Sequence, residues 1–282
     1  MIRSICGTRG MAVAPHALAA QSALAVLREG GNALEAMVAA AATIAVVYPH
    51  MNSIGGDAFW IVHVPGEQPR GIDACGAAAA AASREWYAGR GITGNIPFRG
   101  GVAANTVAGT ISGWDAACAL SRELGGRLPL ARLLADAIHY AESGIAVTQS
   151  QSATTAAKQR ELAPQPGFTA AFLPRGEVPY PGSRFTQPRM GDTLRQLARA
   201  GLDDFYRGEF GHAIAADLSA VGSPVALADL HHHRAQLRTP LVLKHSLGTL
   251  YNMPPPTQGL VSLLILGILD VLDIGKVDPA GA

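Results

Sequence analysis

The segment 33–46 constrains the fold most, because it is apolar on almost every side. Asn32 precedes it and Glu35 follows three residues later, which is the capping-box pattern that begins a helix. A helix that is apolar all round has no face suited to water, so we expect it inside a core. The preceding stretch, 16–29, has one apolar stripe at helical spacing and is predicted to be a first helix.

The pattern changes from helical to extended after Pro49. Two strands joined by a turn at Pro65 and Gly66 are predicted, and the Pro- and Gly-rich segment 164–188 is expected to be a long loop or ordered excursion. The predicted strands are 58–64, 70–74, 241–245 and 249–252. The further predicted helices are 83–87, 112–124, 128–142, 148–162, 192–200, 208–221 and 259–272. With no internal repeat and no linker, we predict one domain of the α+β class, with helices layered on a sheet.

Composition excludes several classes of protein. Hydrophobic residues make up 49% and charged residues 15%, which is typical of a globular chain. A net charge of +1 gives no electrostatic reason to expect nucleic acid as a partner. The apolar stretch 36–48 is too short to span a membrane, so no membrane partner is expected.

The spacing of the cysteines and histidines does not predict a metal site. The three cysteines have no CxxC spacing, so neither a disulfide framework nor a zinc site is predicted, and a reducing cytoplasm is the default location. The segment His231–His233 resembles a metal tract, but adjacent residues on a helix point in different directions. We expect a solvated turn there.

Short motifs in a fixed order carry a resemblance to a known family. They are Gly10–His16 with Gly30–Glu35, Asn52–Phe59, Asn105–Gly109 with Gly113–Trp114, Leu128–Leu130 with Ala141–Gly144, Leu194–Gly201, Phe205–Gly208, Ala228–Leu230 and Pro254–Gly259. Together they resemble the gamma-glutamyltransferase (gamma-glutamyltranspeptidase) family over almost the whole chain. The match implies an N-terminal-nucleophile hydrolase with an αββα four-layer sandwich. It implies no metal and no organic cofactor.

The resemblance also implies how such a protein works. The precursor cleaves itself before a threonine, whose new α-amine then serves as base for its own hydroxyl. That threonine begins the small subunit, and no matching segment occurs here. Thr154 and Thr155 form the only Thr-Thr pair and are interpreted as helix surface. We therefore interpret 1–282 as an incomplete large subunit without the small catalytic subunit. We assign it no catalytic residue and predict that it is inactive alone.

The resemblance places substrate contacts after the second strand. Asp73 matches the family's "Asp-x-Arg-Glu" stretch, but Cys75 stands at the place of its arginine, which grips a carboxylate. The oxamate amidohydrolase-like branch, which this chain resembles more, has its arginine where Ala77 stands. Arg99 is a candidate substitute, and the alternative for it is a surface salt bridge. The predicted substrate-binding residues are thus Asp73, Cys75, Ala77 and Arg99.

Two further residues have competing interpretations. Cys75 is either a nucleophile or, as we favour, a small buried thiol. Asp57 either lines the pocket or caps its turn.

These observations lead to two alternative hypotheses for the function of this chain. The first is the large-subunit portion of an amidohydrolase or acyltransferase, completed by the C-terminal small subunit of the same precursor. Its substrate would be a small amide, oxamate-like or gamma-glutamyl. The second is a truncated, non-catalytic remnant of that family, suggested by the lost arginine and the alanine run that begins at Ala77.

Overall fold

The fold is known from a computed structural model, which describes residues 6–274. Its helices are α1 (Ala17–Arg28), α2 (Ala33–Val47), α3 (Arg84–Ala88), α4 (Thr110–Glu123), α5 (Leu130–Ser143), α6 (Gln149–Leu162), α7 (Phe168–Phe172), α8 (Pro188–Ala200), α9 (Asp204–Arg207), α10 (Glu209–Ala220), α11 (Leu227–His232) and α12 (Gly259–Val271). Its strands are β1 (Ala58–Val62), β2 (Arg70–Ala74), β3 (Ile145–Ala146), β4 (Arg184–Phe185), β5 (Gln236–Arg238), β6 (Leu241–His245) and β7 (Gly248–Asn252).

Helix α2 is the centre of the core, as its sequence predicts. Eleven of its 15 residues are buried, and α1, α4 and α5 pack around it. The predicted capping box is confirmed: the Asn32 amide donates to Glu35 Oε2 at 2.8 Å, and the Glu35 amide donates to Asn32 Oδ1 at 3.0 Å. The other oxygen of Glu35 accepts from the backbone N–H of Leu128 at 2.7 Å, which ties the start of α2 to the segment before α5.

Strand β2 is the middle strand of a three-stranded antiparallel sheet. It pairs with β1 on one side, with Asp73 opposite Phe59, and with β5 on the other, with Asp73 opposite Gln236. Ile72 and Ala74 are buried toward α4, where Gly113 leaves room for the close approach of Ala74. Asp73 lies on the opposite face, because successive strand residues alternate in direction.

The structure differs from the sequence-based prediction mainly in short elements. The segment 164–188 is not one loop, because it contains α7 and also β4, which pairs with β3. Strand β5 lies where no strand was predicted. Helix α8 begins earlier than predicted, at Pro188, since proline is favoured in a first helical turn. The proline segment 254–256 connects β7 to α12 as expected.

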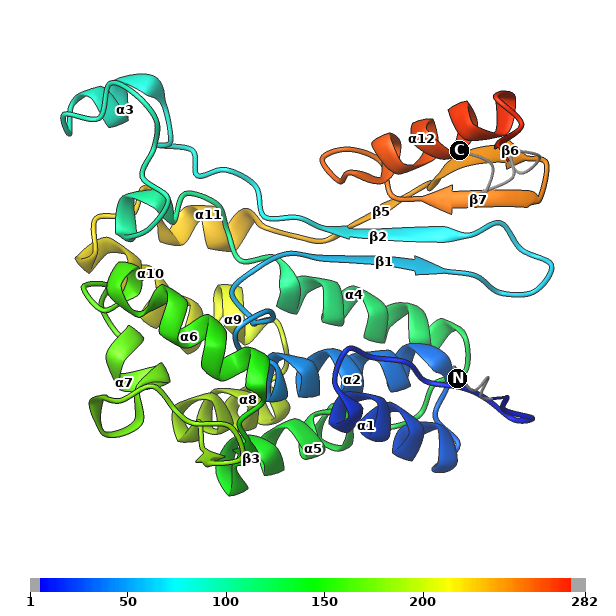
Figure 1. The fold of residues 1–282 in the computed structure, drawn as a ribbon, viewed down its shortest axis with the longest axis horizontal. Helices are drawn as coiled ribbons and strands as arrows, with labels where there is room; N and C mark the ends of the chain where they lie inside the picture. The colour runs from blue at the N-terminus through cyan, green and yellow to red at the C-terminus, as the bar shows by residue number, and fades with distance from the viewer. Residues whose placement is uncertain (1–5, 275–282) are drawn as a thin grey trace, which may run out of the picture.

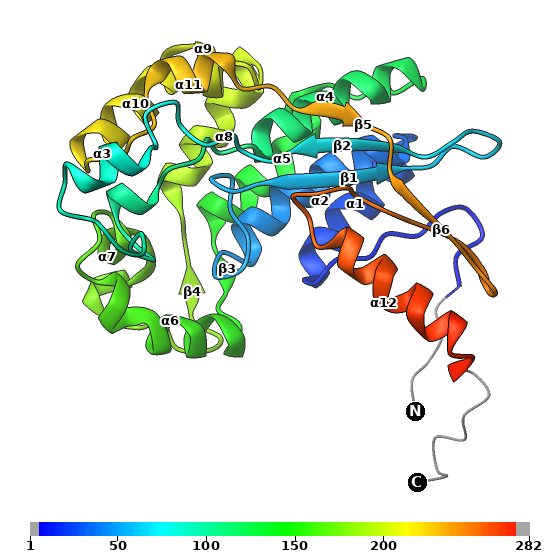
Figure 2. The same ribbon diagram turned by 90° about the horizontal axis from the view of Figure 1, so that it is seen from above.

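The layers follow one another as helix, sheet, strand pair and helix. In Figure 1 the helices α1, α2 and α4 lie below the β1–β2–β5 sheet, and β6, β7 and α12 lie above it. Figure 2 shows that β6 runs obliquely to β1 and β2, and that α3, α7 and α10 gather at the end of the sheet away from the β1–β2 turn. The α+β class and the αββα arrangement are confirmed.

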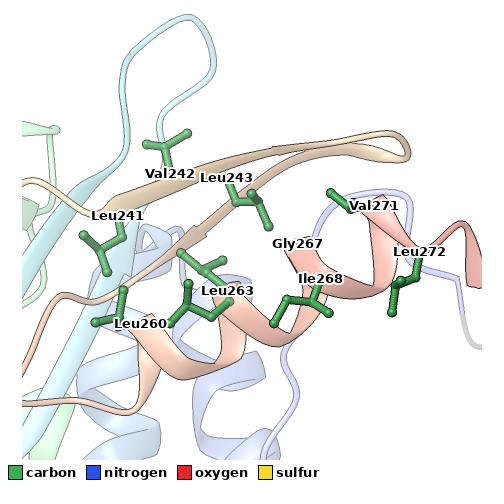
Figure 3. Close-up of a pocket in the computed structure, with 10 residues that line it drawn as sticks. Leu241, Val242, Leu243, Leu260, Leu263, Gly267, Ile268, Val271 and Leu272 are labelled. Carbon is green, nitrogen blue, oxygen red and sulfur yellow. The ribbon is translucent and has the colours of Figure 1, made fainter.

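Helix α12 is apolar all round, yet it is mostly uncovered. Only Gly259 and Leu263 of its 13 residues are buried. Between α12 and β6 runs an apolar groove of about 490 Å³, in which Leu241 and Leu243 point toward the helix and Val242 points away (Figure 3). Among residues 6–274, no helix is long and apolar enough to cross a membrane.

Candidate functional site

A polar pocket of about 410 Å³ opens where the end of β2, α11 and β5 meet. These three elements come from distant parts of the sequence, and the pairing of β2 with β5 brings them together. The pocket is lined by Asp73, Cys75, Ala77, Ala78, Ala80, Val107, Asp229, His232, His233, Arg234, Gln236 and Arg238.

Asp73 is the buried acidic group of this pocket. Its side chain is only 12% exposed. One carboxylate oxygen accepts from the Cys75 amide at 3.0 Å, and the other lies 3.7 Å from Nε of Arg238. The backbone after β2 therefore turns around this carboxylate, with a cation beside it.

The Cys75 thiol lies 3.6 Å from a carboxylate oxygen of Asp57, and the other oxygen of Asp57 accepts from the Gly76 amide at 2.8 Å. Partial burial, followed by the charge of Asp57, raises the pKa of Cys75. A thiol in this setting stays protonated at neutral pH, which makes it a poor nucleophile. Asp57 thus holds the backbone that follows β2, and it lies in a neighbouring pocket beside β1 rather than in this one.

The alanine run forms a fixed wall. The carbonyl of Ala77 accepts from the Val107 amide at 3.0 Å, and the Ala79 amide donates to the Asn105 carbonyl at 2.9 Å. The Ala80 amide donates to Asp229 at 2.9 Å, which ties the run to α11. This short apolar wall contributes no charge to the pocket.

The opposite wall is basic. Arg234 donates through one nitrogen, Nη1, to the carbonyls of His231 at 2.8 Å and of His233 at 2.7 Å. Arg238 extends from β5 and is 49% exposed. The prediction of a solvated turn over His231–His233 was wrong: His231 and His232 end α11, and His233 is only 6% exposed.

His233 is held by a buried network. Ser112 Oγ donates to the Gly109 carbonyl at 2.8 Å and lies 2.9 Å from Nε2 of His233. Since a carbonyl can only accept, the hydroxyl hydrogen is used there and Nε2 is the donor to Ser112. Burial lowers the pKa of His233, against the opposing charges of Asp57 and Asp73. The imidazole is therefore neutral at pH 7 and positions the pocket wall.

The structure brings together three of the four predicted substrate residues. Asp73, Cys75 and Ala77 line the same pocket. Arg99 does not line it, because its Nε lies 2.9 Å from Glu161 in a surface ion pair. The sequence reasoning missed Arg238, because β5 has three exposed residues and no alternating pattern that would indicate a strand.

The Thr-Thr pair lies outside this pocket's lining, whereas His232 and His233 of the histidine tract line it. Thr154 and Thr155 lie inside α6, but Thr155 is buried, so the surface interpretation was wrong for that residue. In the described range 6–274, no three His, Cys, Asp or Glu side chains lie close enough to hold a metal ion.

Comparison with known proteins identifies the relatives of this fold. The family model described as gamma-glutamyltranspeptidase matches residues 19–282. The chain belongs to the gamma-glutamyltranspeptidase family. It is 58% identical over 281 residues to the oxamate amidohydrolase proenzyme of Klebsiella pneumoniae, covering 99% of this chain and 53% of that relative. It is 36% identical to the glutathione hydrolase-like YwrD proenzyme of Bacillus subtilis, covering 99% of this chain and 52% of the relative.

Solved structures of this family share the fold. The gamma-glutamyltranspeptidase of Helicobacter pylori matches 99% of this chain and 80% of its own, with a TM-score of 0.90 and 26% identity. That of Pseudomonas nitroreducens, complexed with L-DON, matches 98% of this chain and 81% of its own, with a TM-score of 0.83 and 31% identity. The chain spans about half the length of the two proenzymes it matches.

Proposed function

We propose that this chain is the large-subunit portion of a gamma-glutamyltranspeptidase-family amidohydrolase that cleaves a small amide such as oxamate. The observation that carries the proposal is the 58% identity to an oxamate amidohydrolase proenzyme along nearly all of this chain. The domain 1–282 is then an incomplete large subunit. The small catalytic subunit of the same precursor is its partner, and the cytoplasm is its proposed location.

The proposed chemistry is acyl transfer through an N-terminal threonine of the small subunit. The threonine oxygen attacks the amide carbonyl carbon, its proton passes to the threonine α-amine, and ammonia leaves with a proton. Water then cleaves the resulting ester, which frees the acid and restores the threonine. For oxamate the products are ammonia and oxalate.

The role of this chain is to bind and orient the substrate. We assign that role to the pocket that contains Asp73, Cys75 and Ala77, which lies beside the face of the β1–β2–β5 sheet opposite α4. The raised pKa of Cys75 argues against the thiol as an alternative nucleophile. The threonine would therefore have to come from the partner subunit.

The partner's binding surface is the apolar face of α12. Its exposed leucine, isoleucine and valine side chains include Leu264 at 55%, Ile265 at 53% and Ile268 at 59%. A contiguous apolar face of this size is typical of a protein interface. The C-terminal half of the precursor supplies the layer that covers it.

Expression of the full reading frame that contains this chain tests the proposal. Intact-mass and N-terminal sequence analysis should find two polypeptides, the second beginning with threonine, and the product should release ammonia from oxamate. A threonine-to-alanine variant of that second segment should remain one uncleaved chain without activity. A single polypeptide ending at Ala282 would contradict the proposal and favour the non-catalytic remnant.

A further inference from the structure

Arg238 is the polar group of the pocket with the most unused hydrogen-bonding capacity. Its guanidinium carries five N–H donors, and its ion pair with Asp73 uses the Nε side at 3.7 Å. Its two terminal nitrogens have no hydrogen-bond partner among the residues that the structure describes. The side chain is 49% exposed, so these nitrogens are accessible to a ligand.

Asp229 and Arg234, which line the same pocket, each bond to the backbone. Asp229 accepts from the Ala80 amide at 2.9 Å through one oxygen and from the Ala226 amide at 2.8 Å through the other. Arg234 Nη1 is shared between two carbonyls. Among the described residues of the pocket, Arg238 is therefore the arginine that has both terminal nitrogens available to a ligand, as a pair of parallel N–H donors.

The register of the sheet fixes where Arg238 lies. Arg238 is opposite Gly71, and Asp73 is two residues further along the same face of β2. Because Gly71 has no side chain, Asp73 is the nearest charged group to Arg238 on that face. The Asp73 carboxylate holds the guanidinium at the pocket that Ala77 and Ala78 also line.

We propose that the pocket binds the carboxylate of a small anionic amide, and that Arg238 is the specificity-determining residue that grips it through its terminal nitrogens. A guanidinium matches a carboxylate in a bidentate pair, and such charge-assisted bonds are stronger than neutral ones. The alanines that line the pocket provide no further cation for the carboxylate of the ligand. The choice of an amide substrate rests on the proposed function, whereas the carboxylate preference rests on Arg238 and its neighbours.

A comparison of two substrates distinguishes carboxylate binding by Arg238 from a purely structural role of this residue. Oxamate carries a carboxylate next to its amide, and oxamide replaces that carboxylate with a second, neutral amide. In the protein expressed from the full reading frame, Arg238→Gln should lower kcat/KM for oxamate about 100-fold and for oxamide less than about threefold. Arg238→Lys should recover part of the loss for oxamate.

Arg99→Gln is the matched control. Arg99 is 47% exposed and is also ion-paired, but with Glu161 outside the pocket. This variant should leave kcat/KM for both substrates within about twofold of the parent. If Arg238→Gln lowers both substrates equally, or lowers neither, the inference is wrong.

Binding of oxamate tests the inference even if the protein hydrolyses neither amide. In calorimetric titration, the parent and Arg99→Gln should bind oxamate, and Arg238→Gln should bind it at least about 30-fold more weakly. Binding that depends on Arg238 without hydrolysis would contradict only the proposed function. No binding by the parent, or equal binding by Arg238→Gln, would overturn the inference itself.

Discussion

Helices α2 and α12 are both apolar on all sides, yet their surroundings are opposite. In α2, 11 of 15 residues are buried, whereas in α12 only two of 13 are. The difference lies in their neighbours, since three helices pack around α2, whereas α12 packs on one side against β6 and β7. An apolar helix therefore predicts burial, and the structure shows whether this chain itself supplies the residues that bury it.

Truncation of a leucine in the α2 core should give the largest effect in this comparison. Leu134 lies in α5, which packs against α2, and it is fully buried. Leu134→Ala should lower the free energy of unfolding by about 4 kcal/mol, because it removes apolar contacts and leaves a cavity. Denaturant unfolding measures this, and a loss below about 1 kcal/mol would contradict the rigid core described here.

Removal of the Glu35 carboxylate should have the next largest effect. Glu35→Ala leaves the amides of Asn32 and Leu128 without their acceptor and should cost about 3 kcal/mol. Glu35→Gln keeps one acceptor oxygen and should cost less than the alanine variant. Equal losses for the two variants in denaturant unfolding would show that the hydrogen bonds are not the cause.

Tyr206 should make the stability of the core depend on pH in strong alkali. Burial raises its pKa to about 12, above the usual value of about 10 in an unfolded chain. The unfolded state therefore loses its proton first, and this contribution to stability falls between about pH 10 and pH 12 by up to about 3 kcal/mol.

Tyr206→Phe is the variant that isolates this effect. It should flatten the alkaline slope of unfolding free energy against pH. It should also cost about 2 kcal/mol below pH 10, since the hydroxyl donates to the Ala108 carbonyl and accepts from the Ser112 amide. An unchanged slope would mean that other groups cause the alkaline loss.

The smallest effect should come from α12. Leu264 is 55% exposed, so Leu264→Ala in this chain should change the free energy of unfolding by no more than about 0.5 kcal/mol. In the protein from the full reading frame, the same substitution should cost about 2 kcal/mol if a second subunit covers the helix. Equal costs in the two proteins would contradict the proposed partner surface.

The sequence predicts those elements whose signals are local. The cap at Asn32 and the apolar periodicity of α1 and α2 lie within a few residues, so these helices were predicted closely. The end of β2 was also evident. Asp73, Cys75 and Ala77 were grouped through the family resemblance, and the structure places them in the lining of one pocket.

The rest depends on contacts between distant residues. Strand β5 has only three residues, all exposed, so it shows no alternating pattern from which a strand is predicted. Its pairing with β2 brings Arg238 to the site. Likewise, His233 is buried because Ser112 and Tyr206 surround it, and nothing in its own neighbourhood of the sequence indicates that.

The position of β2 between β1 and β5 also sets an order of events during protein synthesis. Strand β1 emerges from the ribosome just before β2, but β5 follows only after every helix from α3 to α11 has been made. One edge of β2 therefore has no partner strand while the residues between β2 and β5 are made, and an open strand edge can pair with other chains. Nascent chains stalled before residue 236 should be more prone to association than chains in which β5 has emerged.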